Sequence, residues 1–274
     1  MYVVSVRVTI DDLRLDWSSV VKVLESFISN CVAESGVKGV VVGLSGGVDS
    51  SVTVTLCVRA LGSSRVYGLI MPDTTVTPEV DVRDAIDLAR KLNIRYDVID
   101  IHPIYSSYAK HVPAYSDEVV VANGNLRARI RMTILYYYAN KFNYLVAGTG
   151  DRSEILIGYF TKYGDGGVDI LPIGCLYKTQ VRMLGEYLGL PKHIVYKPSS
   201  PRLWTGHEAE KELGMRYEDI DLVLYSIFDL NIPPDDVPKV TGVDKSVVKR
   251  VLEMYERSKH KRSLPPIPKI PRRK

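Results

Sequence analysis

The first half of the chain alternates between strand-like and helix-like hydrophobic patterns. Apolar and polar residues alternate from Val4 to Ile10, which predicts a half-buried strand. Apolar residues recur at helical spacing from Trp17 to Val32, which predicts a helix. Short apolar runs typical of buried strands follow at 37–44, 66–71, 95–101 and 144–148.

Helices are expected between these strands, at 50–61, 77–92 and 124–141. Thr77 and Pro78 have the residue types of an N-cap and a first helical residue. Strands that alternate with helices are joined by right-handed crossovers and form parallel sheets. The pattern therefore predicts an α/β fold with a doubly wound, mostly parallel sheet flanked by helices.

The later part of the chain is expected to be mostly helices and loops. Asp244 is placed to cap a helix whose apolar positions run from Val247 to Tyr255. Lys, Arg and Pro become frequent after residue 258, which is typical of a solvated tail. We expect one domain over residues 1–262, with a helical C-terminal region, followed by a basic, proline-rich tail at 263–274.

The composition of the chain bears on whether it binds nucleic acid or membrane and on the compartment it suits. The chain is 46% hydrophobic and 25% charged, as in ordinary soluble proteins, and its formal net charge of +4 is too small to indicate nucleic acid. No apolar run approaches the roughly 18 residues of a membrane span, and the N-terminus lacks the features of a signal peptide. Cys31, Cys57 and Cys175 have no metal-ligand spacing and suit a reducing compartment. We expect a cytoplasmic protein that binds neither nucleic acid nor membrane.

A glycine-rich loop follows the strand at 37–44 and reads SGGVDSS at residues 45–51. Its glycines let backbone amides turn inward and let a phosphate approach closely. The start of the next helix adds free N–H groups and a positive dipole end. Ser45, Ser50 and Ser51 add hydroxyl donors. The loop is therefore expected to bind phosphate.

This loop is not a Walker A loop, because it contains no lysine. It carries Asp49 instead, and a carboxylate beside phosphates suits a site in which Mg²⁺ bridges them. A bare Gly-Gly-x-Asp is most often a structural turn. The complete string between a buried strand and a helix favours binding.

A second glycine-dense block follows the strand at 144–148. It contains GTGDRSE at 148–154, GYFTKYGDGGVD at 158–169 and KTQVR at 178–182. Glycine-dense loops at the carboxyl end of a strand are typical of ligand binding.

Five polar residues of this block are candidates for contacts with a ligand. Glu154 is a candidate second carboxylate for Mg²⁺, while Lys162 and Lys178 are placed to neutralise phosphates. Thr149 and Asp169 offer hydrogen bonds to a polar ligand. Taken singly, such residues are most often surface or helix-end residues, so the case for binding depends on the block as a whole.

The phosphate loop resembles that of the N-type ATP pyrophosphatases, which include NAD, GMP, argininosuccinate and asparagine synthetases and tRNA-thiolating enzymes. The second block is similar to the GTxxxSE and GYFTKYGDGGxD signatures of the NAD synthetase family. Further matches are GNLRARIRM at 124–132 and HKR at 260–262, so the resemblance covers nearly the whole chain. It implies an adenine nucleotide alpha-hydrolase-like fold and ATP-dependent amidation of deamido-NAD by ammonia, which yields NAD, AMP and pyrophosphate.

The resemblance also implies residue roles. Asp49, Glu154 and Lys178 would form the catalytic centre, with Asp49 and Glu154 holding Mg²⁺. The implied ATP contacts are Gly43, Leu44, Ser45, Gly46, Gly47, Val48, Asp49, Ser50, Thr149, Lys178 and Ser200. The implied deamido-NAD contacts are Arg129, Lys162, Asp169, His260 and Lys261.

The family resemblance implies a homodimer with the dinucleotide across the subunit interface. The helix at 125–141, with Tyr136, Tyr137 and Tyr138, is a candidate interface element. Ordinary packing of that helix within one chain is the alternative.

The chain departs from the family after Ser200, which stands where threonine is usual. The family pattern LWxGQTDExELG reads LWTGHEAEKELG at 203–214, so His207 replaces glutamine and Ala209 replaces an acidic residue. Because this loop is thought to close over the reaction, the departures bear on lid behaviour and ammonia handling more than on binding. His207 is of a type that titrates near neutrality, although a lone loop histidine is more often incidental.

The implied chemistry proceeds by adenylation, because a free carboxylate repels nucleophiles and has a poor leaving group. Magnesium, the loop amides and Lys178 would offset charge on the departing pyrophosphate. Glutamine-dependent relatives carry an attached glutaminase or nitrilase-type domain, for which 274 residues leave no room. Free ammonia is therefore the expected nitrogen donor, with a separate glutaminase partner left open.

Three alternatives compete with this assignment. A GMP synthetase core or a tRNA-thiolating enzyme shares the phosphate loop, but the run at 159–169 favours NAD synthetase. A nucleotide-binding module of the universal-stress kind binds without catalysis and does not need Asp49 and Glu154 together. A protein that interacts through its basic tail is the weakest alternative, because such a tail can also decorate an enzyme.

Overall fold

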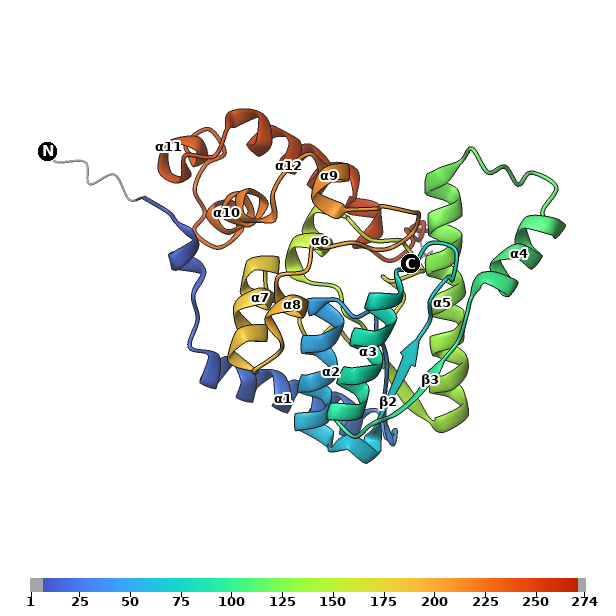
Figure 1. Ribbon diagram of the computed structural model, residues 1–274. Helices are drawn as coiled ribbons and strands as arrows, with labels where there is room; N and C mark the ends of the chain where they lie inside the picture. The colour runs from blue at the N-terminus through green and yellow to red at the C-terminus, as the bar shows by residue number, and fades with distance from the viewer. Residues whose placement is uncertain (1–6, 271–274) are drawn as a thin grey trace, which may run out of the picture.

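The computed structural model describes residues 7–270, which are built around a four-stranded parallel sheet (Figure 1). The strands, in the order β3-β2-β1-β4, are β1 (Gly39–Gly43), β2 (Val66–Ile70), β3 (Arg95–Val98) and β4 (Tyr144–Ala147). The strands β1, β2 and β3 lie side by side in chain order, and β4 lies on the other side of β1. This reversal puts a topological switch point between β1 and β4, where α/β proteins bind ligands. The predicted fold class is confirmed.

The central strand is buried on both faces. Val40 pairs with Val66 of β2 and Leu145 of β4. Val40 and Val42 belong to one hydrophobic core, whereas Val41 between them belongs to another. Successive side chains of a strand point to opposite faces, so a strand covered on both sides is apolar throughout rather than alternating.

Helices cover both faces of the sheet (Figure 1). The first core is closed by α1 (Trp17–Glu34), α2 (Val48–Leu61), α3 (Glu79–Lys91), α7 (Lys178–Tyr187) and α8 (Lys192–Val195). The other face packs against α4 (His102–His111) and α5 (Val120–Phe142), and a short 3₁₀ turn, η2 (Ser63–Arg65), precedes β2. The α4 helix was not predicted from the sequence.

The later part of the chain is mostly helices and loops, as expected from the sequence, and its helices form a further core beside the sheet layers (Figure 1). They are α6 (Arg152–Ile157), α9 (Ala209–Leu213), α10 (Tyr217–Phe228), α11 (Val237–Thr241) and α12 (Lys245–Arg257), followed by a 3₁₀ turn, η3 (Lys259–Lys261). Asp244 caps α12 as predicted, because its carboxylate accepts a hydrogen bond from Ser246 N at 2.7 Å.

Two local predictions are wrong. Residues 4–6 of the strand expected from Val4 to Ile10 lie outside the described residues, and residues 7–10 form no strand but lead into a 3₁₀ turn, η1 (Ile10–Leu13). Val8 is buried in the C-terminal core and donates its N–H to Val240 O, so the apolar spacing reflects helix packing rather than a sheet. Pro78, not Thr77, occupies the N-cap position of α3 and makes no side-chain capping bond, while Thr77 Oγ1 accepts a hydrogen bond from Asp73 N.

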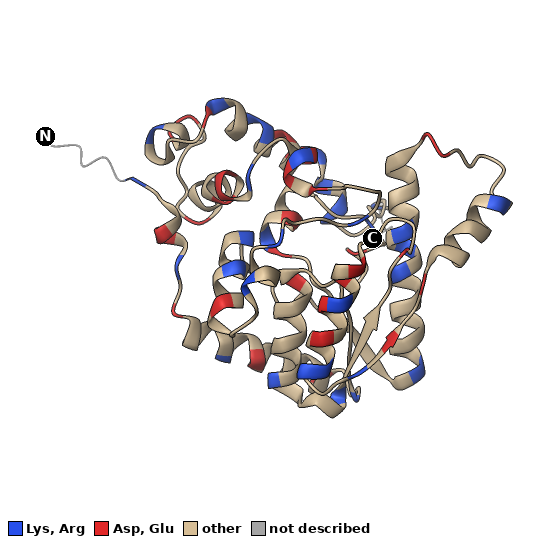
Figure 2. Ribbon diagram, viewed as in Figure 1, with Lys and Arg blue, Asp and Glu red and all other residues tan. Residues whose placement is uncertain are grey.

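Charged residues of both signs are interspersed over the helices (Figure 2). No helix within residues 7–270 combines the length and apolar character that a bilayer crossing requires.

Candidate active site

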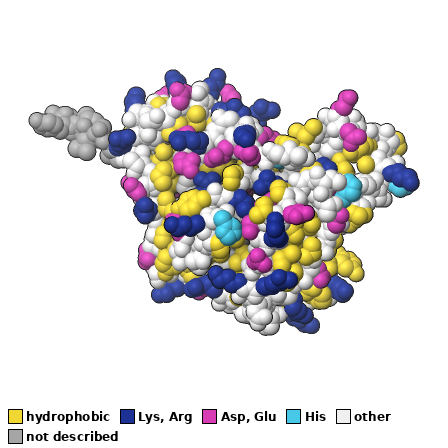
Figure 3. Space-filling model, in the orientation of Figure 1, with side chains coloured by type: hydrophobic (Ala, Val, Ile, Leu, Met, Phe, Trp, Pro, Cys, Tyr) yellow, Lys and Arg dark blue, Asp and Glu magenta, His cyan; other side chains and the backbone are white. Residues whose placement is uncertain are grey.

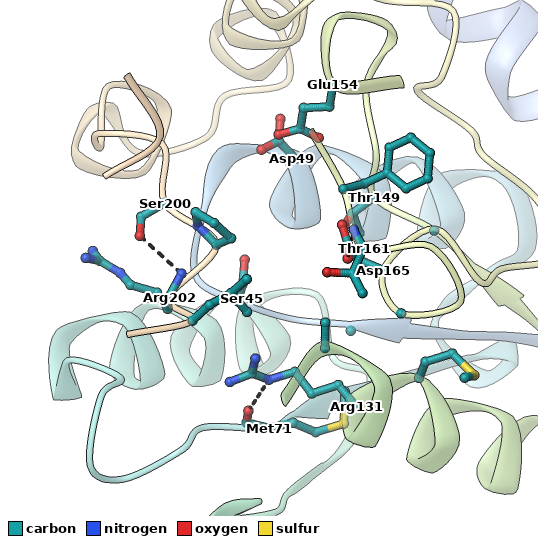
Figure 4. A pocket seen from close by; sticks show the side chains of 18 of the residues that line it. Ser45, Asp49, Met71, Arg131, Thr149, Glu154, Thr161, Asp165, Ser200 and Arg202 are labelled. Carbon is teal, nitrogen blue, oxygen red and sulfur yellow. Dashed lines mark hydrogen bonds between the residues drawn. The ribbon is translucent and has the colours of Figure 1, made fainter. Parts of the chain in front are cut away.

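A cavity of about 380 Å³ opens where the carboxyl ends of the strands meet (Figure 4). Its wall includes residues 43–45 after β1, 70–72 after β2 and 147–149 after β4. Side chains of α5, residues within 158–168 and residues 199–204 form further parts of the wall. The cavity therefore lies at the switch point between β1 and β4.

The phosphate loop joins β1 to α2 at one side of this cavity. Gly46 has φ +75°, and a Cβ there would lie 2.2 Å from the backbone oxygen of Asp81. Ser45 N donates to Ser50 Oγ at 3.2 Å, and Ser51 Oγ donates to Gly47 O at 2.7 Å. The loop is thus shaped by its own short side chains, and it leads into the N-terminus of α2, as an anion site requires.

The cavity exposes only some of the predicted ATP contacts. Those that line it are Gly43, Leu44, Ser45, Asp49, Thr149 and Ser200. Gly47 and Val48 line a smaller adjoining pocket, while Gly46 and Ser50 are buried and shape the loop from behind.

The predicted catalytic residues meet in one cluster. The ammonium of Lys178 is fully buried and lies 2.7 Å from Asp49 Oδ2 and 2.9 Å from Glu154 Oε1. Asp151 Oδ2, also buried, lies 2.9 Å from the same nitrogen. The ring of Tyr217, from α10, lies 5.1 Å from it. Asp49 and Glu154 approach one another at one end of the cavity (Figure 4).

Burial and charge shift the pKa values in this cluster: the shift favours the charged form of Lys178 and opposes the charged form of Glu154. Burial opposes the charged form of Lys178, but Asp151, Asp49 and Glu154 more than offset it and raise the pKa of the lysine well above its usual value. Burial, followed by the charge of Asp151, raises the pKa of Glu154 well above its usual value. The lysine is therefore a permanent cation among crowded carboxylates.

The donor set fits a magnesium ion completed by substrate phosphates. Asp49 Oδ1 is buried and has no hydrogen-bond partner within the described part of the chain, so it is available as a ligand. No group of three or more metal-ligating side chains among residues 7–270 is arranged to hold a metal by itself. Magnesium is commonly held by one or two carboxylates together with phosphates, which is what Asp49 and Glu154 beside the phosphate loop offer.

Of the predicted deamido-NAD contacts, only Lys261 lines the cavity. Arg129 donates to Lys162 O, and Lys162 Nζ donates to His260 O at 2.8 Å, so these three basic residues are linked in one group outside the cavity wall. Asp169 lies apart, where its carboxylate accepts hydrogen bonds from Val146 N and from the hydroxyl of Tyr136.

An irregular segment at 197–207, here called the strap, connects α8 to α9 and borders the cavity. Lys197 Nζ donates to Asp81 Oδ1 and to Gly46 O, both at 2.9 Å, and Arg202 Nε donates to Asp81 Oδ2 at 2.7 Å. The sequence analysis missed Asp81, Lys197 and Arg202. Their partners lie more than a hundred positions apart, so no local pattern signals them.

The end of the strap is held by His207, which is only 2% exposed. Its ring stacks on Trp204 with centroids 3.4 Å apart, and its Nε2 lies 2.7 Å from Glu212 Oε2. The hydroxyl of Tyr159 donates to the same carboxylate oxygen at 2.6 Å. Burial lowers the pKa of His207, against the opposing effect of Glu212, so this histidine is a structural residue rather than an incidental one.

Comparisons with known proteins agree with this geometry. The family model for NAD synthase matches residues 20–265. The chain is 58% identical over 265 residues to the NH(3)-dependent NAD(+) synthetase of Staphylothermus marinus, with 96% of each chain covered. It is 53% identical to the protein of the same name from Aeropyrum pernix, with 97% of this chain and 94% of the relative covered.

Two solved structures are also similar. The NMN synthetase of Francisella tularensis superposes with a TM-score of 0.82 at 35% identity, and covers 94% of this chain and 100% of its own. The NH3-dependent NAD synthetase of Campylobacter jejuni superposes with a TM-score of 0.78 at 31% identity, and covers 93% of this chain and 100% of its own. Because the family model and these relatives span nearly the whole sequence, the chain belongs to the NAD synthase family.

Proposed function

We propose that the protein amidates deamido-NAD with ammonia and ATP, yielding NAD, AMP and pyrophosphate. The observation that carries the proposal is the meeting of Asp49, Glu154 and Lys178 beside a phosphate loop without a lysine. Relatives at 53% and 58% identity are named NH(3)-dependent NAD(+) synthetases, which supports the choice of substrate and nitrogen donor.

The chemistry joins two anions, so the site must first offset their repulsion. The carboxylate of the nicotinate ring attacks the α-phosphorus of ATP, the bond to the β-phosphate breaks, and pyrophosphate leaves. Ammonia then attacks the activated carbonyl and AMP departs. Free N–H groups at the start of α2 and the ammonium of Lys178 stabilise the charge that develops on the phosphates.

We assign Mg²⁺ to Asp49 and Glu154, with phosphate oxygens completing its shell. Bound there, the ion supplies charge neutralisation for the departing pyrophosphate. The cavity volume of about 380 Å³ suits one nucleotide better than two.

The second nucleotide is therefore expected to extend from the cavity across the basic group formed by Arg129, Lys162 and His260. Lys261 lines the cavity and directly follows His260 in the chain, and its ammonium donates to Gly158 O and Phe160 O at 2.7 Å. Asp169 is assigned to the same substrate on family resemblance. Together these residues form a path for an anionic ligand longer than ATP.

We further propose a homodimer. Exposed apolar side chains gather on the projecting α4–α5 end of the molecule, and some of them are visible on the face in Figure 3. They include Tyr108, Val112 and the run 119–121. On the expected interface helix, Tyr137 is exposed, whereas the Tyr136 and Tyr138 hydroxyls donate to Asp169 and Asp97 of their own chain. An apolar surface of this kind supports self-association.

Two smaller assignments complete the proposal. Residues 1–262 are taken as the enzyme domain and 263–274 as an appended basic tail. A cytoplasmic location suits Cys31, Cys57 and Cys175, which are all free thiols.

The Francisella relative, called an NMN synthetase, raises a second candidate substrate, the deamido mononucleotide. The decisive experiment incubates the full chain with ATP, Mg²⁺ and ammonium, and offers either deamido-NAD or deamido-NMN. Chromatography follows the amidated product, AMP and pyrophosphate, and a parallel reaction replaces ammonium with glutamine.

Equimolar NAD, AMP and pyrophosphate from deamido-NAD and ammonium is the expected result. Preference for the mononucleotide would reassign the substrate within the same chemistry. Activity with glutamine alone would overturn the nitrogen donor, and absence of AMP formation with either substrate would overturn the enzyme assignment.

A further inference from the structure

Asp151 is the one carboxylate around Lys178 to which neither the motif nor the family resemblance gives a role. It is fully buried, and each of its two oxygens has a separate contact. Oδ1 caps α6 by accepting a hydrogen bond from Glu154 N at 2.8 Å. Oδ2 accepts no hydrogen bond within the described residues, and the ammonium of Lys178 lies 2.9 Å from it.

The charges around Lys178 do not balance. Three carboxylates, Asp49, Asp151 and Glu154, surround one ammonium, so Lys178 alone does not compensate all three when they are ionised. One divalent cation compensates this excess. The excess charge and the free Asp49 Oδ1 thus both favour a Mg²⁺ ion at this point.

The same carboxylates that suit Mg²⁺ are occupied by Lys178. Its ammonium contacts Asp49 Oδ2 and Glu154 Oε1, so a cation held by these two groups repels the lysine. Asp151 is then the remaining carboxylate partner of Lys178. Its Oδ2 is fully enclosed and its Oδ1 is engaged in the helix cap, which leaves it poorly placed as a metal ligand itself.

We propose that Asp151 is a positioning residue that retains Lys178 beside the phosphates when Mg²⁺ takes Asp49 and Glu154. Asp151 thereby sets both the affinity of the metal and the place of the lysine. This inference rests on the proposed function only for the identity of the metal and of ATP.

The substitution Asp151→Asn separates this role from helix capping. Asparagine is as good an N-cap as aspartate, so the cap of α6 is kept while the charge is removed. Lys178 then has only Asp49 and Glu154 as partners and competes with Mg²⁺ for them. Asp244→Asn, at the exposed N-cap of α12, is the matched control for the same exchange at a cap outside the site.

The main readout is Mg²⁺ affinity, measured by calorimetric titration of the full chain in the presence of α,β-methylene-ATP. We expect Asp151→Asn to weaken Mg²⁺ binding by about 10- to 100-fold, the usual effect of removing a group that orients metal ligands. We expect kcat to fall by a similar factor with little change in the KM for deamido-NAD. Asp244→Asn should match the wild type in both measurements.

A double-mutant cycle with Lys178→Met tests the mechanism directly. If Asp151 acts through Lys178, Asp151→Asn has no further effect on Mg²⁺ affinity once the lysine is absent. Asp151→Ser, which also keeps a capping oxygen, replaces Asp151→Asn if that variant does not fold.

Mg²⁺ affinity and kcat equal to the wild type in Asp151→Asn would overturn the proposal and leave Asp151 as a cap alone. Equal effects of Asp151→Asn with and without Lys178 would overturn the link between the two residues. A wild-type protein that binds Mg²⁺ but forms no NAD would instead refute the proposed function, since the metal titration does not depend on turnover.

Discussion

The phosphate loop and the strap border the same cavity but are held in place by different kinds of contact. In the loop, Ser45, Ser50 and Ser51 bond to backbone or side-chain atoms at most five positions away. In the strap, Lys197 pairs with Asp81 and Asp84, 116 and 113 positions away, and Arg202 pairs with Asp81, 121 positions away. The loop is thus built locally between a strand and a helix, whereas the strap is a surface segment tied down by ion pairs. Ion pairs such as those of the strap can be removed without unfolding the sheet.

The largest expected effect comes from breaking the loop itself. Gly46→Ala places a Cβ 2.2 Å from Asp81 O at a backbone φ of +75°. Strain and overlap together should cost about 2–5 kcal/mol of unfolding free energy and abolish ATP binding. Chemical denaturation and nucleotide titration measure the two effects.

Gly47→Ala is the matched control for stability, because its Cβ meets only Ser45 Oγ, at 3.4 Å, and its φ is extended. Equal destabilisation by Gly46→Ala and Gly47→Ala would show that the loop does not depend on this one left-handed glycine.

A smaller effect is expected from releasing the strap. Asp81→Asn removes the carboxylate that pairs with both Lys197 and Arg202, and charge-assisted hydrogen bonds contribute about 1.5–3 kcal/mol each. We expect faster trypsin cleavage after Arg202 and a higher KM for ATP, with the sheet intact. Asp87→Asn, on the exposed face of the same α3 helix, is the control and should leave the cleavage rate unchanged.

The smallest effect concerns His207 and pH. Burial lowers the pKa of His207, so folding favours the neutral ring. The stability that this provides is present above the unfolded-state pKa of about 6.5 and is lost as pH falls through the lower folded-state value. Glu212, Arg202 and Tyr159 are the polar groups that face the ring.

Strap cleavage by a protease should therefore accelerate below about pH 6.5 in the wild type, after correction for protease activity. His207→Gln keeps a donor for Glu212 but does not titrate in this range, so its cleavage rate should be flat with pH. An identical acid response in both proteins would remove His207 as its cause.

The sequence predicted the parts of the site that local structure carries. A buried strand, a glycine loop and a helix start occupy consecutive residues, so Asp49 could be placed beside phosphates before any tertiary contact was known. The family resemblance pointed to Glu154 and Lys178. The sequence did not identify Asp151 as a partner of Lys178. The two residues are 27 positions apart, and the residue type expected at a helix N-cap gives no sign of such a charge contact.

Hydrophobic periodicity by itself determined the α/β class, the helices from α1 to α5 except α4, and the capping of α12, because these depend on burial patterns within a few turns. Periodicity failed at residues 7–10, where Val8 is buried by a distant helical core and not by a sheet.

Only the tertiary structure decided which charges share a partner. It placed Lys178 among three carboxylates, fastened the strap to Asp81, and joined Arg129, Lys162 and His260 in one group. Contacts of this kind join residues that chain folding brings together from far apart. The energy of such an ion pair depends on how deeply it is buried and on the distance between its charges, and neither can be read from a local pattern of residues.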